Sequence, residues 1–145
     1  MRHLTAAQLD FLLNDRDGNG VHDFWRGDIA GLYGLVPPGQ TDPMALIETG
    51  VAEADVRPGA GHSFGARPPV PYWGHWFKAL RHAGETDLSP NRFAACAYPV
   101  RYQYRRRWTY IVSEENVVYR KKLREPWRLE IYPADPIVEG WKKPD

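Results

Sequence analysis

The sequence predicts an α+β domain in which an N-terminal helix packs on an antiparallel β-meander of about four strands. Helical periodicity is confined to the first third of the chain, while aromatic and β-branched runs between turn residues fill the second half. The 13 Pro and 13 Gly among 145 residues disfavour a helical bundle. This length fits a single globular domain, 1–145, with an N-terminal helical segment at 1–14 and a flexible Pro/Gly loop at 57–71.

The first helix is expected over residues 3–14, because Leu4, Ala7 and Phe11 fall on one apolar stripe. Gln8 is expected on the polar side of this helix. The helix starts almost at the first residue, so we expect it to be the end of a longer helix that continues upstream.

A second helix is expected after Thr41 or Asp42, with Pro43 at its first position and an apolar stripe that ends near Ala54. Strands are expected at 72–80, 92–98, 108–113, 117–121 and, as a short edge strand, 129–132. The third and fourth of these flank Glu114-Glu115-Asn116, which predicts a hairpin. The small residues of 94–97 would let a helix lie close to a central strand.

Residues 15–25, which read DRDGNGVHDFW, carry the clearest chemistry in the chain. Calcium loops offer oxygen ligands at alternate positions and place a glycine at the sixth. Gly20 occupies that sixth position. The alternate positions here are Asp15, Asp17, Asn19, the backbone carbonyl of Val21, and Asp23.

The twelfth position of the loop departs from this pattern, because Arg26 stands where a bidentate Glu is usual. Asp28 could supply the missing oxygen if the chain folds back. The alternative is a polar turn in which Asp and Asn side chains bond their own backbone. The sequence leaves both interpretations open, with Ca²⁺ as the expected cofactor and Mg²⁺ disfavoured by its octahedral geometry.

Charge is unevenly distributed although the chain carries a net charge of only +1. Residues 1–55 hold three Arg against nine acidic residues, and residues 101–128 hold nine Arg or Lys against three Glu. The segment from Arg101 to Trp108 mixes bases and aromatics, but the low total charge and the lack of an RNA-binding signature argue against nucleic acid. A solvated basic loop that enters a strand fits better, since Lys and Arg at strand edges discourage aggregation.

Enzyme chemistry finds little support in the sequence. The single Cys96 lies among alanines, which favours a buried structural thiol, and no serine lies in a nucleophile elbow. None of the five histidines has metal-ligand spacing. Two alternatives to a structural domain remain: a standalone ligand- or partner-binding module that uses the aromatic strand, and a metal-dependent hydrolase at the Asp cluster.

Three motifs follow one another along the chain: the DGNG loop after the first helix, WFKAL at 76–80, and TYIVSEENVVY at 109–119. Over roughly residues 3–136 this series resembles an uncharacterised family of bacterial secreted or membrane-anchored proteins. That family is similar to the globular heads of type IV pilin-like and type II secretion pseudopilin-like proteins.

The resemblance implies a non-enzymatic structural or interaction domain, the soluble head of a pilin- or pseudopilin-like envelope protein. Its partners would be proteins or copies of itself in a filament-like complex. In such a pilin-like assembly the basic loop from Arg101 to Trp108 could face an acidic neighbour, for which the N-terminal part of the chain is a candidate. Contact with a membrane would come only through an upstream helix, and the location would then be the cell envelope or outside the cell. The chain as given contains no apolar run of the roughly 20 residues that span a bilayer.

Overall fold

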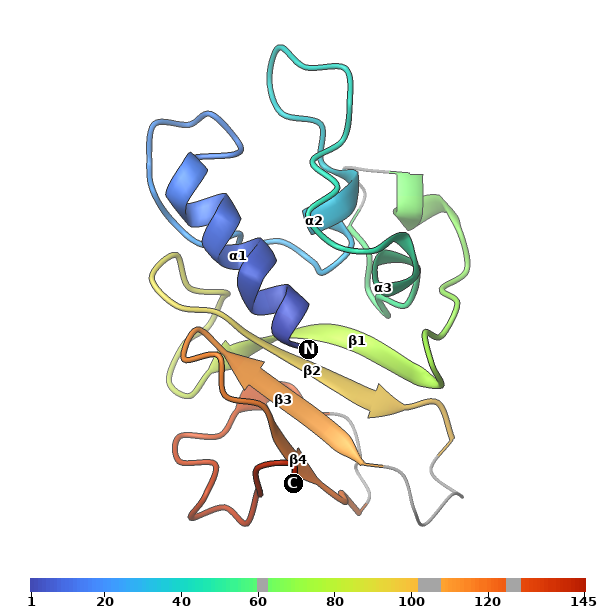
Figure 1. The fold of residues 1–145 in the computed structure, drawn as a ribbon, viewed down its shortest axis with the longest axis vertical. Helices are drawn as coiled ribbons and strands as arrows, with labels where there is room; N and C mark the ends of the chain where they lie inside the picture. The colour runs from blue at the N-terminus through green and yellow to red at the C-terminus, as the bar shows by residue number, and fades with distance from the viewer. Residues whose placement is uncertain (60–62, 102–107, 125–128) are drawn as a thin grey trace.

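A curled sheet with all helices on one of its faces forms the architecture of the computed structural model (Figure 1). The structure describes residues 1–59, 63–101, 108–124 and 129–145. The helices are α1 (Arg2–Asn14), α2 (Gly31–Gly34) and α3 (Thr49–Glu53), with a 3₁₀ turn at Ser63–Ala66. The strands are β1 (His75–His82), β2 (Ala94–Pro99), β3 (Thr109–Ser113), β4 (Tyr119–Lys121) and β5 (Ile131–Tyr132).

The sheet has the strand order β4-β3-β2-β1-β5. Neighbours among the first four strands are antiparallel, but β5 runs parallel to β1, with Arg81 opposite Ile131 and His82 opposite Tyr132. The predicted antiparallel meander of about four strands is therefore wrong. The sheet is mixed, has five strands and curls into a half-barrel, and helices make up only 18% of the chain.

The position of β5 explains this error. The strand β1 comes first in the sequence and leaves one sheet edge open, whereas β4 lies at the opposite edge. The chain therefore crosses from one edge of the sheet to the other before the two residues of β5 pair with β1. No local pattern in so short a strand indicates which edge it joins.

Helix α1 confirms the predicted apolar stripe, because Leu4, Ala7 and Phe11 are buried. Gln8 is also buried, so its predicted place on the polar side is wrong. Its amide is satisfied across the chain: Gln8 Oε1 accepts from the Trp25 N–H at 2.9 Å, and Gln8 Nε2 donates to the Trp25 carbonyl at 3.2 Å. A buried amide with two such bonds costs little.

The second helix is shorter than predicted, because α3 begins at Thr49 rather than near Pro43. The N–H groups of residues 44–46 instead bond to the carbonyls of residues 35, 33 and 32, at 2.8–3.0 Å. Bonds to the α2 segment thus replace the helical bonds that Met44–Glu48 would otherwise make. In the 57–71 loop, Phe64 is buried and its ring packs edge-on against Tyr33 at 5.7 Å. Residues 60–62 of that loop lie outside the described residues.

Two apolar clusters lie on the two faces of the sheet. The outer cluster joins Leu4 and Ala7 of α1 to Ala95 and Ala97 of β2, as the small residues of that strand predicted. The inner cluster contains Leu80, Cys96, Tyr98, Ile111, Tyr119, Tyr132 and Trp141. The predicted β3–β4 hairpin is confirmed, with Thr109 opposite Lys121.

Candidate functional site

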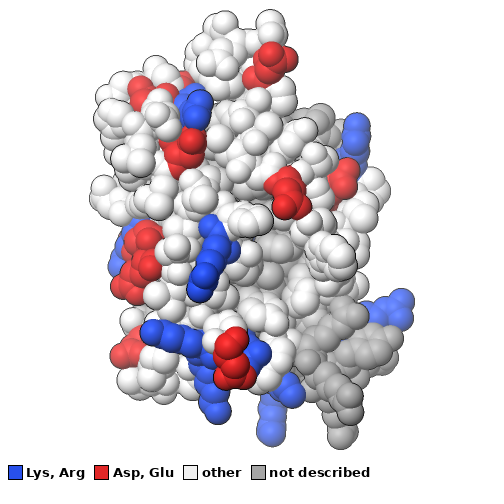
Figure 2. Space-filling model, in the orientation of Figure 1, with Lys and Arg blue, Asp and Glu red and all other residues white. Residues whose placement is uncertain are grey.

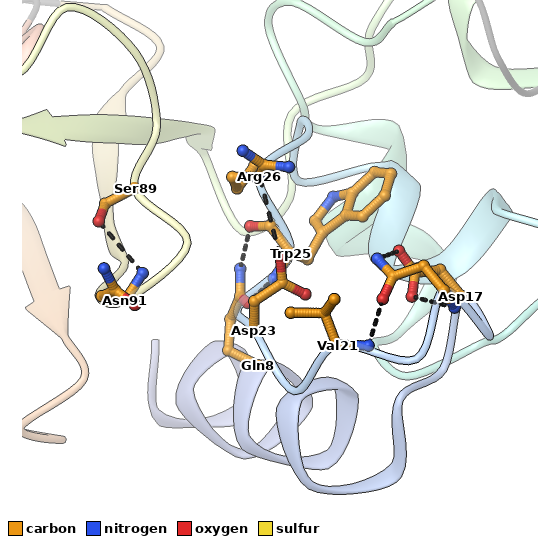
Figure 3. Close-up of polar contacts among 9 residues, drawn as sticks. Gln8, Asp17, Val21, Asp23, Trp25, Arg26, Ser89 and Asn91 are labelled. Carbon is orange, nitrogen blue, oxygen red and sulfur yellow. Dashed lines mark hydrogen bonds and ion pairs between the residues drawn. The ribbon is translucent and has the colours of Figure 1, made fainter.

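The loop of residues 15–23 joins the end of α1 to the segment that contains Trp25 (Figure 3). Both sides of the loop are fixed. Gln8 on α1 holds the backbone of Trp25 through its two bonds, and the ring nitrogen Nδ1 of His22 lies 2.8 Å from the Leu12 carbonyl. The loop is therefore anchored to α1 at two levels, although most of its residues are exposed.

Within the loop, the side chains at alternate positions turn inward and bond the backbone. Asp15 accepts from the N–H groups of Asn19 and Gly20, at 3.2 and 2.9 Å, and Asn19 Oδ1 accepts from the Val21 N–H at 2.7 Å. Asp17 accepts from the side-chain amide of Asn19 at 2.9 Å. The sharp turn predicted at Gly20 is confirmed by its φ of 80°.

A polar turn and a calcium-binding loop can use the same carboxylates. A carboxylate has about four acceptor positions on two oxygens, and a bond to the backbone uses only one of them. The Asp15 and Asp17 oxygens therefore keep lone pairs that can bind a cation. The polar turn arranges the same side chains that a calcium loop needs.

Negative charge accumulates in the loop. Partial burial raises the pKa of Asp17, and the neighbouring carboxylates of Asp15 and Asp23 raise it further. Arg26 is the cation nearest to Asp23, but its Nε lies 4.0 Å from Asp23 Oδ2, and Arg16 pairs with Asp10 at 2.5 Å. The loop thus holds like charges that its own bases only partly compensate.

The side chains as placed do not form a complete metal centre. Across the ranges that the structure describes, no group of three or more His, Cys, Asp or Glu is positioned to hold an ion. Asp23 faces Arg26 and would have to turn toward Asp17 to become a ligand.

Asp28 lies at a different place from the other candidate ligands. Its Oδ1 accepts from the Gly31 N–H at 2.8 Å, and its Oδ2 accepts from the Gly59 N–H. Nearby, the buried Asp55 accepts from the N–H groups of Ala30 and Arg57, at 2.8 and 2.9 Å. These two carboxylates form a junction between distant segments, and burial raises the pKa of Asp55, with the charge of Asp28 adding to the effect.

A metal-dependent hydrolase at the Asp cluster would need His22, Asp23 and Asp28 to meet in one cleft, but these residues have separate partners. His22 lies against the Leu12 carbonyl, Asp23 faces Arg26, and Asp28 bonds Gly31 and Gly59. The predicted burial of Cys96 is confirmed, and burial raises the pKa of its thiol to about 12. Such a thiol is protonated at neutral pH and is a poor nucleophile.

Acidic residues outnumber basic ones at the helical end, whereas the described residues 108–124 and 129–145 carry six Lys or Arg and six Asp or Glu. Figure 2 shows Lys and Arg toward the lower end of one face with acidic side chains among them, and further acidic residues toward the helical end. Near β4, Arg120 Cζ and Lys122 Nζ lie 4.6 and 4.8 Å from the centre of the Trp108 ring. Residues 102–107 of the predicted basic segment lie outside the described residues.

Sequence reasoning missed a pocket on the inner face of the sheet, where Lys78 and Trp76 lie with Tyr98. The available signal was a lysine at an inward position of a strand whose neighbours are apolar, since Lys78 alternates with the buried Phe77 and is itself 9% exposed. A charged side chain in that position needs a partner.

Comparison with protein-family models, with curated proteins and with solved structures finds no match to this chain. In the described part of the chain no helix has the length and apolar character required to cross a membrane.

Proposed function

We propose that this chain is a non-enzymatic structural and interaction domain in which the loop of residues 15–23 binds one Ca²⁺ ion. The observation that carries the proposal is the inward arrangement of Asp15, Asp17 and Asn19 around a turn with positive φ at Gly20. Carboxylate, amide and backbone oxygens in this order are the ligands that calcium prefers.

The ion would act as a clip between α1 and the rest of the domain. The loop begins at Asp15, the residue that ends α1 with a left-handed φ of 44°, and it leads to Trp25. Burial and the charges of Asp15 and Asp23 raise the pKa of Asp17, and a cation would neutralise that repulsion. Asp23 would turn from Arg26 to complete the site. Arg26 at the twelfth position lowers the number of oxygens, so affinity should fall below that of sensor loops.

Thermal unfolding with Ca²⁺, Mg²⁺ or EDTA tests this proposal. An ion that binds only the folded state raises the melting temperature by mass action. We expect a rise that saturates with millimolar Ca²⁺, little effect of Mg²⁺, and loss of the calcium effect in Asp17→Asn/Asp23→Asn. Asp42→Asn, an exposed carboxylate outside the loop, is the matched control and should keep the wild-type response. Equal melting temperatures in Ca²⁺ and EDTA would reduce the loop to a turn.

The uneven distribution of charge favours a second part of the proposal, association with copies of the chain or with an acidic protein partner. Residues 101–128 carry nine Arg or Lys against three Glu and residues 1–55 carry three Arg against nine acids, so the two segments are complementary, and complementary charge steers and orients association. Contact between two different patches of the same chain extends into a filament unless it closes into a ring. The resemblance to pilin-like heads leads to the same expectation.

Sedimentation velocity at low and high salt tests this part. Self-association should weaken as salt rises, because screening shortens the reach of exposed charges to about 10 Å at 0.1 M. The double change Lys122→Glu/Lys143→Glu reverses exposed charge near β4 and the C-terminus and should abolish association, whereas Lys→Arg changes at the same positions should preserve it. A monomer at every salt concentration would leave only a separate acidic partner, which the same variants test by pull-down against an acidic peptide.

A further inference from the structure

The inner face of the half-barrel contains a pocket of about 250 Å³. Its floor is made by β1 and β2, where Trp76 stands directly opposite Tyr98 in the antiparallel register. Val56 and Pro69 add apolar walls. The pocket lies far along the chain from the 15–23 loop, and the inference below does not depend on calcium.

The pocket exists because two segments share the outer edge of β1. Near one end of β1 the Val56 N–H donates to the Phe77 carbonyl at 3.2 Å, and farther along the Arg81 N–H donates to the Glu130 carbonyl at 3.3 Å. The two segments meet the strand at positions four residues apart, which is about 13 Å along a strand. The gap between them opens over the inward side chain of Lys78.

Three charged groups meet at this gap. Lys78 Nζ bonds Glu130 Oε2, and the Arg57 guanidinium lies 3.8 Å from Glu130 Oε1. Among the described residues that line the pocket, two cations therefore face one carboxylate. The Lys78 side chain is only 11% exposed, whereas that of Glu130 is 46% exposed.

This difference in exposure makes Glu130 the replaceable member of the group. Lys78 is held by its strand, and an ammonium has three donors, so it can bond a second acceptor from the pocket. Glu130 can turn outward into water because its side chain is 46% exposed, and an incoming carboxylate then takes its place beside the buried Lys78. A carboxylate that enters the pocket would then find both Lys78 and Arg57.

We propose that this pocket binds a small aromatic monocarboxylate, with the ring against Trp76 and Tyr98 and the carboxylate between Lys78 and Arg57. The excess of one positive charge selects a monoanion. The volume lies just below the roughly 300–1,000 Å³ of drug-sized sites and corresponds to about ten non-hydrogen atoms. The aromatic floor selects a flat apolar body, since ring pairs gain stability in offset or edge-on contact.

Ligand titrations, monitored by calorimetry and by amide NMR shifts, test the proposal. The four ligands are phenylacetate and three relatives of it that lack the charge, lack the ring or carry the opposite charge. Phenylacetate should bind with a Kd of about 0.1–1 mM. Neutral phenylacetamide and ringless acetate should each bind at least about tenfold more weakly. Phenethylammonium, which would use Glu130 instead, should not compete. Absence of saturation with phenylacetate up to about 10 mM, or tighter binding of phenethylammonium, would overturn the proposal.

Variants assign the roles of the charges. Lys78→Met should weaken phenylacetate binding at least about tenfold, because it removes the buried cation at similar volume. Glu130→Gln should strengthen it about threefold to tenfold by removing the competing anion. Lys143→Met and Glu115→Gln, two exposed residues that the pocket does not need, are controls. If Lys78→Met does not fold, the two single variants Arg57→Gln and Glu130→Gln decide. Weaker phenylacetate binding by Arg57→Gln together with stronger binding by Glu130→Gln supports the proposal, and any other pair of results contradicts it.

Discussion

Two groups of carboxylates differ in what they hold. The loop of residues 15–23 places Asp15, Asp17 and Asp23 near the surface. Asp15 and Asp17 accept hydrogen bonds only from groups inside this nine-residue loop among the bonds described above. The junction of Asp28 and Asp55 bonds backbone N–H groups between 2 and 31 positions away, and Asp55 is only 2% exposed. One group shapes a local turn, whereas the other connects distant parts of the fold.

This difference separates a candidate ligand site from a structural one. A buried carboxylate that satisfies buried N–H groups is fully used by the fold, and removal of it leaves those donors unpaired. An exposed carboxylate in a self-bonded turn keeps lone pairs that face solvent. Asp carboxylates of the first third of the chain therefore serve two purposes: those of the loop can bind a ligand, and those of the junction stabilise the fold.

The largest effect is expected for Asp55→Ala. The change leaves the N–H groups of Ala30 and Arg57 without their acceptor inside the protein, which should lower the free energy of unfolding by about 3 kcal/mol. Urea unfolding measures this value. Asp42→Ala removes an exposed carboxylate and should stay within about 0.5 kcal/mol of wild type. A similar loss in both variants would contradict the structural role.

The pH dependence of Asp55 has a defined sign. Burial raises the pKa of Asp55 in the folded state above its ordinary value of 3.8, so the folded protein binds the proton more tightly than the unfolded chain. The contribution of this group is full below pH 3.8 and falls as pH rises through the raised pKa. Stability of wild type relative to Asp55→Asn should therefore decrease from pH 3.5 toward neutrality. An increase would show that bonding to the ionised form outweighs burial.

The next effect is expected for Gln8→Ala, which removes the two bonds between α1 and Trp25. Loss of about 2 kcal/mol is expected, because the Trp25 N–H and carbonyl are partly buried. Gln40→Ala is the exposed control. The same variant should also weaken the calcium response of the adjoining loop, whereas a wild-type response would show that the loop forms independently of this bond.

A smaller effect is expected at Glu130, whose side chain is more exposed than the carboxylates of either group. The bond from Lys78 lowers the pKa of Glu130 below its ordinary value of 4.5. Its contribution is therefore present above pH 4.5 and is lost as pH falls through the lowered pKa. Wild type should exceed Glu130→Gln in stability at neutral pH, by about 1 kcal/mol or less. The difference should vanish in acid, and a constant difference would exclude the ion pair as its cause.

The elements that the sequence predicts well are those with local signals. The stripe of Leu4, Ala7 and Phe11 located α1, the turn at 114–116 located the β3–β4 hairpin, and Gly20 located the sharp turn of the loop. Each of these depends on residues that are neighbours in sequence.

The features that the sequence did not reveal depend on contacts between distant segments. β5 joins the open edge of β1, residues 44–46 bond the α2 segment instead of forming a helix, and Gln8 is buried by Trp25. Asp28, predicted as a calcium ligand, bonds Gly31 and Gly59. The Lys78 pocket likewise exists only where two separate segments meet β1.

The smallest effect is expected for Asp17→Asn without calcium. Burial and the charges of Asp15 and Asp23 raise the pKa of Asp17, so the ionised form is unfavourable in the folded state. The amide removes the charge and keeps an oxygen that can accept from Asn19. In EDTA this variant should be equal to wild type or more stable by a few tenths of a kcal/mol, about the size of one like-charge pair. A clear loss of stability would favour the polar turn.

Calcium titration by calorimetry tests the central claim most directly. The account predicts one site per chain in wild type, the same site in Asp28→Asn because Asp28 belongs to the junction, and no binding in Asp17→Asn/Asp23→Asn. Calcium binding that survives the loop double variant, or no binding by the wild-type chain, would contradict it.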